Sequence, residues 1–357
     1  MPGIVGPFKT VTSNVAPLEA HIGHLRHLSN PTAARRLLQA DFAFTPAAAR
    51  KTARLFCAHI GQSLHFYEQG KDASIRIRPD LQYYSYLNLS VAAILAYQPA
   101  NWDRYRQHGV QHKFHNVKQL DLASAVLKVS QGAVPLFHSI LSDVDLNSRT
   151  FRFGEIAAGI GMLSYELSEA FGKKTQRISV SDSIVEDAGV FYSQVSFNSW
   201  INEALSPITY KRLEDAMPLL ISDYVRVPGG RNPLVYKSIA SWTSTDAASE
   251  SHRRNCMKLV NYGGHFIEDN SLGRNRLYLW HGVSRLPLLP TLTSLLLLSF
   301  SLSSLVRYRP DLLNAALNSP HQLLIDTFVQ ESDGIFLPAL RNLLYRQEIS
   351  ISSNEFM

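Results

Sequence analysis

The sequence predicts an α+β protein that is predominantly α, with a helical core and a small β-containing insertion. Three observations predict this class. Of the 357 residues, 45% are hydrophobic and 18% are charged, which is enough apolar material for one large domain or two smaller ones. Apolar residues recur at helical spacing in the first and last thirds of the chain. Between them lie short β-branched and aromatic segments separated by Gly, Pro, Asn and Asp.

These patterns divide the chain into four regions. Residues 1–30 are expected to be an irregular N-terminal arm, and residues 31–175 to be the first part of the helical core. Residues 176–283 are expected to form the β-containing insertion. Residues 284–357 are expected to complete the helical core.

Helix signals are clearest near the N-terminus. Residues 31–42 and 45–70 are rich in Ala, Leu and Arg and predict two helices. Thr45 and Pro46 suit the N-cap and first turn of the second, and Gly70 suits its end.

The next helix is predicted from Pro79 to the residues before Pro99. The spacing of its apolar residues predicts one apolar stripe, which consists of Tyr84, Leu87, Val91 and Ile94.

Another helix is predicted over residues 151–172, where apolar residues recur at helical spacing up to Gly172. Five strands are then predicted, with a helix near residues 201–220 among them: 177–185, 190–198, 221–227, 234–243 and 276–280. Helices return after Pro290, over residues 291–307, 311–332 and 337–349.

Residues 286–306 carry no charge, and their length fits a membrane span. Five Ser, two Thr and two Pro fit that interpretation poorly, so a buried helix starting near Pro290 is favoured and no membrane partner is expected. The N-terminus lacks the pattern of a signal peptide. Cys57 and Cys256 lie far apart in the sequence, so we do not expect a disulfide framework. We expect a cytoplasmic location instead.

The most unusual stretch of the chain is polar and basic, at residues 100–120. From Trp102 to His115 it contains two Arg, three His and one Lys. An imidazole transfers protons near neutral pH, and a guanidinium offers a forked cation to phosphate oxygens. Five residues separate Arg106 from His112, a spacing that resembles the Arg–His motif of HEPN-type ribonucleases, which need no metal. The alternative is a solvated loop.

The histidines of this segment also suggest a metal site. His108, His112 and His115 would share one face of a helix and could ligate zinc. Gly109 weakens such a helix, and no Cys or carboxylate completes the ligand set, so no metal is expected.

Arg76 and Arg78 precede the tyrosine-rich helix. They either face the phosphates of a bound nucleotide or RNA, or make ion pairs and carbonyl contacts at the start of the helix. Tyr83, Tyr84 and Tyr86 either stack on bases or are core aromatics with satisfied hydroxyls, which is the favoured interpretation.

Several nucleotide and hydrolase motifs are missing from the sequence, including the phosphate-binding P-loop, the GxSxG elbow and HExxH. Gly159 and Gly161 lie inside a predicted helix and not after a strand, so they give no dinucleotide fingerprint. No cofactor is therefore predicted.

Three segments in order resemble the YaaC-like proteins. The first is SIRIRPDLQYYSYLNLSVAAILAY followed by QHGVQHK, and the second is PLFHSIL with FRFGEIAAGI. The third is the Leu/Ser-rich stretch from residue 286 to 317, which ends in RY-x-P and a short helix. The order and spacing are similar over roughly residues 55–345, which is most of the chain.

The resemblance implies a bacterial, intracellular protein whose helical core is related to HEPN domains. That superfamily contains ribonucleases and non-catalytic RNA- or nucleotide-binding members, often dimeric and often in toxin or phage-defence systems. Four positions match the family pattern: Arg78, Asn88, His108 and Gly109. Arg106 and His112 match only the looser HEPN spacing, and the His-rich N-terminal arm is longer than in typical members.

Two functions from different classes follow from these residues and the resemblance. The first is an RNA-directed ribonuclease or defence effector, in which Arg106 holds the phosphate and His108 or His112 transfers the proton. Its sites would combine across a homodimer, and its substrate-binding residues would be Arg76, Arg78, Asn88, Arg104 and Lys113. The second is a non-catalytic regulatory module in which the basic segment binds a nucleotide, an RNA or a partner protein. A purely structural subunit is a third alternative.

Overall fold

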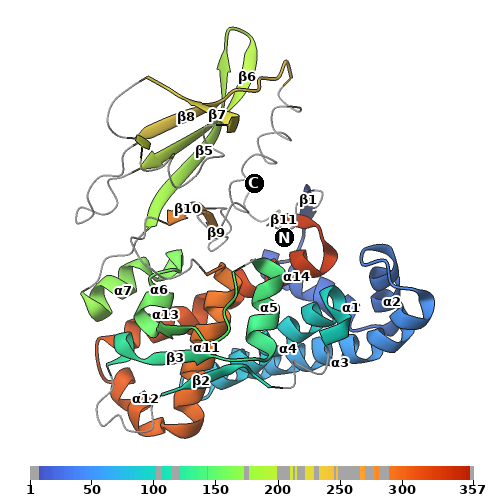
Figure 1. Cartoon of the computed structure of the whole chain (residues 1–357), viewed down its shortest axis with the longest axis vertical. Coiled ribbons are helices and arrows are strands. Elements are labelled where there is room, and N and C mark those ends of the chain that lie inside the picture. Colours follow the sequence, from blue (N-terminus) through green and yellow to red (C-terminus); the bar gives the residue numbers. More distant parts are fainter. Residues whose placement is uncertain are drawn as a thin grey trace. The chain divides into compact units, whose positions relative to one another are not determined.

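The structure is a computed structural model. It describes residues 8–101, 107–113, 121–142, 144–172, 177–198, 210–211, 214, 222–228, 233–244, 247, 266–269, 276–280 and 289–353. The chain forms two compact units, one from residues 6–173 and 289–357 and the other from residues 174–288. The predominantly α, α+β fold class is confirmed (Figure 1).

Helices make up most of the first unit. They are α1 (Pro17–Leu28), α2 (Pro31–Ala40), α3 (Pro46–Lys71), α4 (Arg78–Tyr97), α5 (Ala133–Leu141), α6 (Phe153–Ala157), α7 (Ser164–Phe171), α11 (Thr291–Tyr308), α12 (Pro310–Leu317), α13 (His321–Glu331) and α14 (Asp333–Tyr345). Short 3-10 turns occupy Pro99–Asn101, Leu122–Ser124 and Gly161–Leu163.

Helix α11 lies at the centre of the first unit. Every residue from Leu292 to Leu305 is buried, because neighbouring helices, α4 above all, cover its circumference. It is the one helix in the described part of the chain that is long and apolar enough to cross a bilayer, and 78% of it is buried inside the fold. The predicted buried helix near Pro290 is therefore confirmed.

The predicted N-terminal helices are also confirmed. Thr45 caps α3 by accepting a hydrogen bond from the backbone of Ala48, and Pro46 occupies its first turn. Helix α4 begins at Arg78 and ends at Tyr97, before Pro99.

Two small sheets complete this unit. Strands β2 (Val110–His112), β3 (Val126–Val129) and β4 (Thr150–Arg152) form an antiparallel sheet in the order β2-β3-β4, which the sequence did not predict. Strand β1 (Phe8–Ser13) pairs in parallel with β11 (Glu348–Ser353), so the two ends of the described chain lie side by side.

The second unit contains an antiparallel sheet with the strand order β7-β8-β6-β5-β10-β9. Its strands are β5 (Arg177–Asp187), β6 (Val190–Asn198), β7 (Tyr224–Arg226), β8 (Leu234–Ser238), β9 (Phe266–Asp269) and β10 (Arg276–Trp280). The five predicted strands are all present. Nearly all of the helix predicted near residues 201–220 lies outside the described residues.

The single helix expected over residues 311–332 is wrong, because the chain forms α12 and α13 there, with Asn318 to Pro320 between them. Three further expectations about local structure were wrong. Residues 1–30 are not an irregular arm throughout, because β1 and α1 lie within them. Pro17 starts α1, and Ile22, Leu25 and Leu28 are buried along it. The histidines between these apolar residues hid the helical pattern, although His21 is itself buried.

The other two errors concern helix ends. Residues 151–172 form β4, α6 and α7 and not one helix, because the chain turns near Gly159. Helix α14 ends at Tyr345 and not at residue 349, because Arg346 adopts a left-handed conformation with φ of 48° and directs the chain into β11.

Candidate functional site

The first half of α4 brings together the chemically most notable side chains of the helical unit. Tyr83 and Tyr86 are fully buried, which agrees with core aromatics, whereas Tyr84 is half-buried. We define the His108 cluster as Tyr83, Tyr84, His108, Phe300 and Arg307.

The backbone around His108 is fixed by a close approach of two glycines. Gly109 has φ of 77° and Gly132 has φ of 154°, and a Cβ on Gly132 would lie 2.5 Å from the nitrogen of Gly109. Only glycine fits such a contact. The carbonyls of Gln107 and His108 accept hydrogen bonds from Ala133 (2.8 Å) and Val134 (3.1 Å), so they satisfy the first free amides of α5.

The side chain of His108 is held by Tyr83. The two rings stack with centroids 5.5 Å apart, and the Tyr83 hydroxyl is hydrogen-bonded to Nδ1 of His108. Burial raises the pKa of the Tyr83 phenol, while burial and the nearby Arg307 charge lower the pKa of His108. The hydroxyl has no other hydrogen-bond partner among the described residues, and its buried proton would be left unsatisfied if Nδ1 were the donor, so we infer that the hydroxyl donates to Nδ1.

This hydrogen bond determines the tautomer of His108. A neutral imidazole whose Nδ1 accepts a proton donor carries its own proton on Nε2. Within the described part of the chain nothing hydrogen-bonds to Nε2, and His108 is only partly buried. His108 therefore presents an N–H donor at neutral pH.

Arg307 at the end of α11 covers the tyrosines. Its guanidinium carbon lies 5.5 Å from the ring centroid of Tyr84 and 5.0 Å from that of Tyr308. Arg307 donates to the Tyr84 hydroxyl over 2.9 Å and pairs with Asp80 over 3.2 Å. Asp80 also accepts a hydrogen bond from Ser303. The ion pair with Asp80 and the hydrogen bond to Tyr84 hold the guanidinium over the aromatic rings.

The rings of His108 and His112 both lie beside that of Phe300. The Phe300 ring centroid is 6.2 Å from that of His108 and 6.5 Å from that of His112. Nε2 of His112 is hydrogen-bonded to the Ser301 hydroxyl over 2.9 Å, and burial lowers the pKa of His112 to about 3. His112 is therefore neutral near pH 7 and cannot deliver a proton as an imidazolium.

The predicted binding residues of α4 have partners within the protein. Arg78 pairs with Asp333 over 3.5 Å, the arrangement expected of a pair at the start of a helix. Asp333 also accepts hydrogen bonds from Gln82 and Tyr86. Burial raises the pKa of Asp333, and these three donors oppose that shift.

Three other residues that were predicted to bind substrate are not part of the His108 cluster: Asn88, Arg76 and Lys113. Oδ1 of Asn88 accepts a hydrogen bond from Nδ1 of the His59 ring over 2.8 Å, and Nδ2 of Asn88 donates to the Tyr84 carbonyl over 2.8 Å, so Asn88 links α4 to α3 and to its own backbone. Arg76 is exposed and donates to Asn314 over 3.0 Å. Lys113 is exposed directly after β2.

Arg104, Arg106 and His115 lie outside the described residues, so the predicted roles of Arg104 and Arg106 stay predictions. Within the ranges that the structure describes, no group of three His, Cys, Asp or Glu side chains could hold a metal ion.

Sequence reasoning missed Arg307, Asp80 and Phe300. Arg307 follows the uncharged residues 286–306, and its charge was the feature of the sequence that could have identified it. Its partnership with Asp80 depends on a contact across 227 positions of chain and leaves no local pattern.

Comparison with known proteins gives one match. A family model described as YaaC-like Protein matches residues 26–344. No curated protein and no solved structure matches the chain. Because the family match covers most of the sequence, the chain belongs to the YaaC-like family.

Proposed function

We propose that the chain is a non-catalytic module that binds single-stranded RNA over the His108 cluster. The observation that carries this proposal is the hydrogen bond between the buried Tyr83 hydroxyl and Nδ1 of His108, in which we infer that the hydroxyl donates. It keeps a proton on Nε2, which suits donation to a phosphate or base oxygen. The same tautomer cannot accept the proton of a ribose 2′-hydroxyl at Nε2, so it favours binding over base catalysis.

Aromatic and cationic groups support the choice of RNA. Tyr84 is half-buried and Tyr308 is 68% exposed, and Arg307 lies over both rings. Stacking of bases on aromatic rings and guanidinium groups is the usual basis of single-strand recognition. Asp80 offsets the charge of Arg307, so Arg76 and Lys113 would supply the attraction for phosphates.

The test is fluorescence anisotropy with a labelled short single-stranded RNA, in EDTA and at several salt concentrations. The intact protein should bind, and Tyr84→Leu and His108→Ala should each weaken binding by roughly fivefold to a hundredfold, as expected for a lost stacking or donor contact. His65→Ala is the control, because His65 is exposed on α3 and makes no contact with the cluster. Absence of RNA binding, or equal binding by all four proteins, would contradict the proposal.

A metal-independent ribonuclease is the second candidate. One observation favours it, which is that His108 and His112 contact the same Phe300 ring. The reaction would need Arg106 at the phosphate and a change of the His108 tautomer. Cleavage of the RNA in EDTA that disappears in both His108→Ala and His112→Ala would replace the binding proposal with this one.

A cytoplasmic location is a proposal that rests on the two distant cysteines and on the resemblance. A dimer or protein partner and a role in toxin or defence systems are proposals that rest on the resemblance alone. Light scattering of the purified protein tests the dimer directly. If RNA binding is lost when the protein is diluted until it is monomeric, the dimer contributes to the RNA-binding site.

A further inference from the structure

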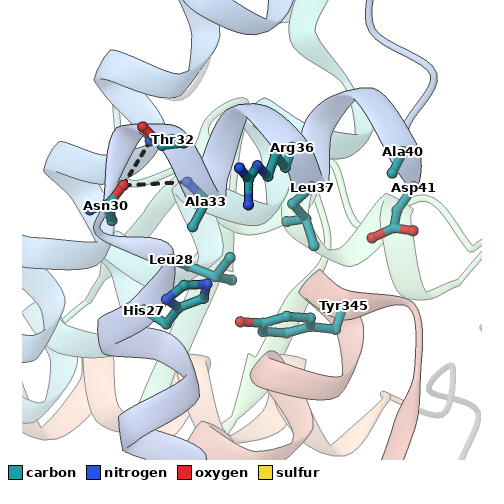
Figure 2. Close-up of a pocket in the computed structure, with 10 residues that line it drawn as sticks. All are labelled: His27, Leu28, Asn30, Thr32, Ala33, Arg36, Leu37, Ala40, Asp41 and Tyr345. Carbon is teal, nitrogen blue, oxygen red and sulfur yellow. Dashed lines mark hydrogen bonds between the residues drawn. The ribbon is translucent and has the colours of Figure 1, made fainter.

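A cavity of about 500 Å³ opens between the end of α1, helix α2 and the end of α14. Its walls are formed by His27, Leu28, Asn30, Thr32, Ala33, Arg36, Leu37, Ala40, Asp41 and Tyr345. Figure 2 shows the Tyr345 ring reaching under α2, with Arg36 on the helix above it and Asp41 beyond the end of α2. The volume is in the range of small-molecule sites.

Tyr345 forms a fixed aromatic surface in this cavity. The guanidinium carbon of Arg341 lies 4.3 Å from the Tyr345 ring centroid, and the hydroxyl donates to the carbonyl of His24 over 3.1 Å. The ring is thus held at its hydroxyl end and supported by a cation. It remains only half-buried and lines the cavity, so a planar group can stack on it.

The charge around the cavity is positive. Arg341 is 3% exposed, and it donates to uncharged acceptors: His24 (3.2 Å), Asn342 (3.1 Å) and the carbonyl of Gln347 (3.2 Å). Among the side chains that the structure describes, which do not include that of Glu348, no carboxylate forms an ion pair with Arg341. A buried cation without a counter-charge is costly, and an anion nearby would offset that cost.

Two further side chains define what the cavity accepts. Arg36 is exposed at the rim and forms no ion pair with a described residue, so its guanidinium can meet an anion. Asp41 is the acidic residue of the lining, and its half-buried carboxylate can accept a hydrogen bond from an amino group.

We propose that this cavity binds a planar aromatic anion of nucleoside-monophosphate size. The ring stacks on Tyr345, its amino edge meets Asp41, and the phosphate meets Arg36 and the field of Arg341. This site is separate from the His108 cluster and does not depend on the function proposed there. It would give the protein a small-molecule ligand in addition to RNA.

The test is calorimetric titration of the full chain with the four nucleoside monophosphates, adenosine and ribose 5-phosphate. At least one amino-bearing monophosphate should bind and raise the unfolding temperature. Arg36→Gln should weaken it by about tenfold or more, and Tyr345→Leu should weaken it further. Arg35→Gln is a matched control, because Arg35 is the neighbouring residue and bonds to Pro31 and Thr32 of its own helix.

Three results would overturn the proposal. The first is failure of all four monophosphates to bind. The second is equally strong binding of ribose 5-phosphate, which would remove the ring from recognition. The third is binding that survives Arg36→Gln but is lost in His108→Ala, which would place the ligand at the His108 cluster. Arg36 is exposed, so its variant tests the site even if Tyr345→Leu fails to fold.

Discussion

Tyr83 controls which nitrogen of His108 carries the proton, and this can be measured directly. Tyr83→Phe removes the hydroxyl that donates to Nδ1 and leaves the ring stack in place. We expect the Nε2–H tautomer of the folded protein to give way to a mixture, with a loss of about 1 kcal/mol in the free energy of unfolding. Nitrogen chemical shifts of the imidazole report the tautomer.

Tyr308→Phe is the control for this change, because Tyr308 is 68% exposed and the hydroxyl bonded to His108 is that of Tyr83. It should leave the His108 tautomer unaltered. A Tyr83→Phe protein that still shows pure Nε2–H would mean that another group fixes the ring, and the main support for RNA binding would be removed.

His138 makes stability depend on pH. It is 1% exposed, and burial lowers its pKa from 6.5 to about 4. Below about pH 6.5 the unfolded chain takes up a proton that the folded protein does not, so stability is lost as the pH falls towards 4. This histidine should contribute up to about 1.4 kcal/mol per pH unit, measured by urea unfolding. In His138→Asn the free energy of unfolding should change less steeply with pH, by that amount. An unchanged pH dependence would show that His138 is not its cause.

At the scale of elements, the contact between the Gly109 turn and α5 places His108. Gly132→Ala would bring a Cβ to 2.5 Å from the nitrogen of Gly109 and 2.6 Å from the carbonyl of Gln107, at a φ of 154°. We expect a loss of at least about 2 kcal/mol in the free energy of unfolding, because both the strain and the displaced α5 amides contribute. Denaturant unfolding measures the loss.

Gly61 in the interior of α3 provides the opposite case. A Cβ there would meet nothing within 4 Å, so Gly61→Ala should stabilise the protein by roughly 0.5–1 kcal/mol through lower backbone entropy of the unfolded chain. If Gly132→Ala and Gly61→Ala change the free energy of unfolding in the same direction, the contact between the Gly109 turn and α5 does not place His108.

The elements also show what local sequence reveals. Helices α3, α4 and α11 were predictable because proline, capping residues and gaps in the apolar pattern mark their ends. Strand β11 was not, because it depends on pairing with β1 at the far end of the chain. The short sheet β2-β3-β4 has three or four residues per strand, which is too few for an alternating pattern to stand out.

The residues of the candidate site also divide into those that the local sequence reveals and those that depend on long-range contacts. His108 and the tyrosines could be selected from composition and spacing, since they lie close in sequence. The roles of Arg307 and Asp333 could not, because each depends on a long-range partner, Asp80 and Arg78 respectively. The partial burial of His112, which lowers its pKa and keeps it neutral, also depends on packing against α11 and leaves no local pattern in the sequence.

At the scale of the whole molecule, each unit has its own hydrophobic core. In the helical unit the core includes Leu298 and Phe336, both fully buried. In the second unit it includes Phe197, whose ring lies edge-on to that of Tyr236 at 5.7 Å. Separate cores mean that the two units can unfold separately, because cooperativity depends on shared buried contacts.

Calorimetric unfolding of the full chain should therefore show two transitions. Phe197→Ala removes a fully buried aromatic ring and should destabilise the second unit by about 3–5 kcal/mol, lowering only one transition. Leu298→Ala should lower the other transition by a comparable amount, about 2–5 kcal/mol. RNA binding at the His108 cluster should follow the transition that Leu298→Ala lowers, since α11 carries Phe300 and Arg307. If either variant lowers both transitions together, the units share one cooperative fold, and neither could be assigned the binding surface on its own.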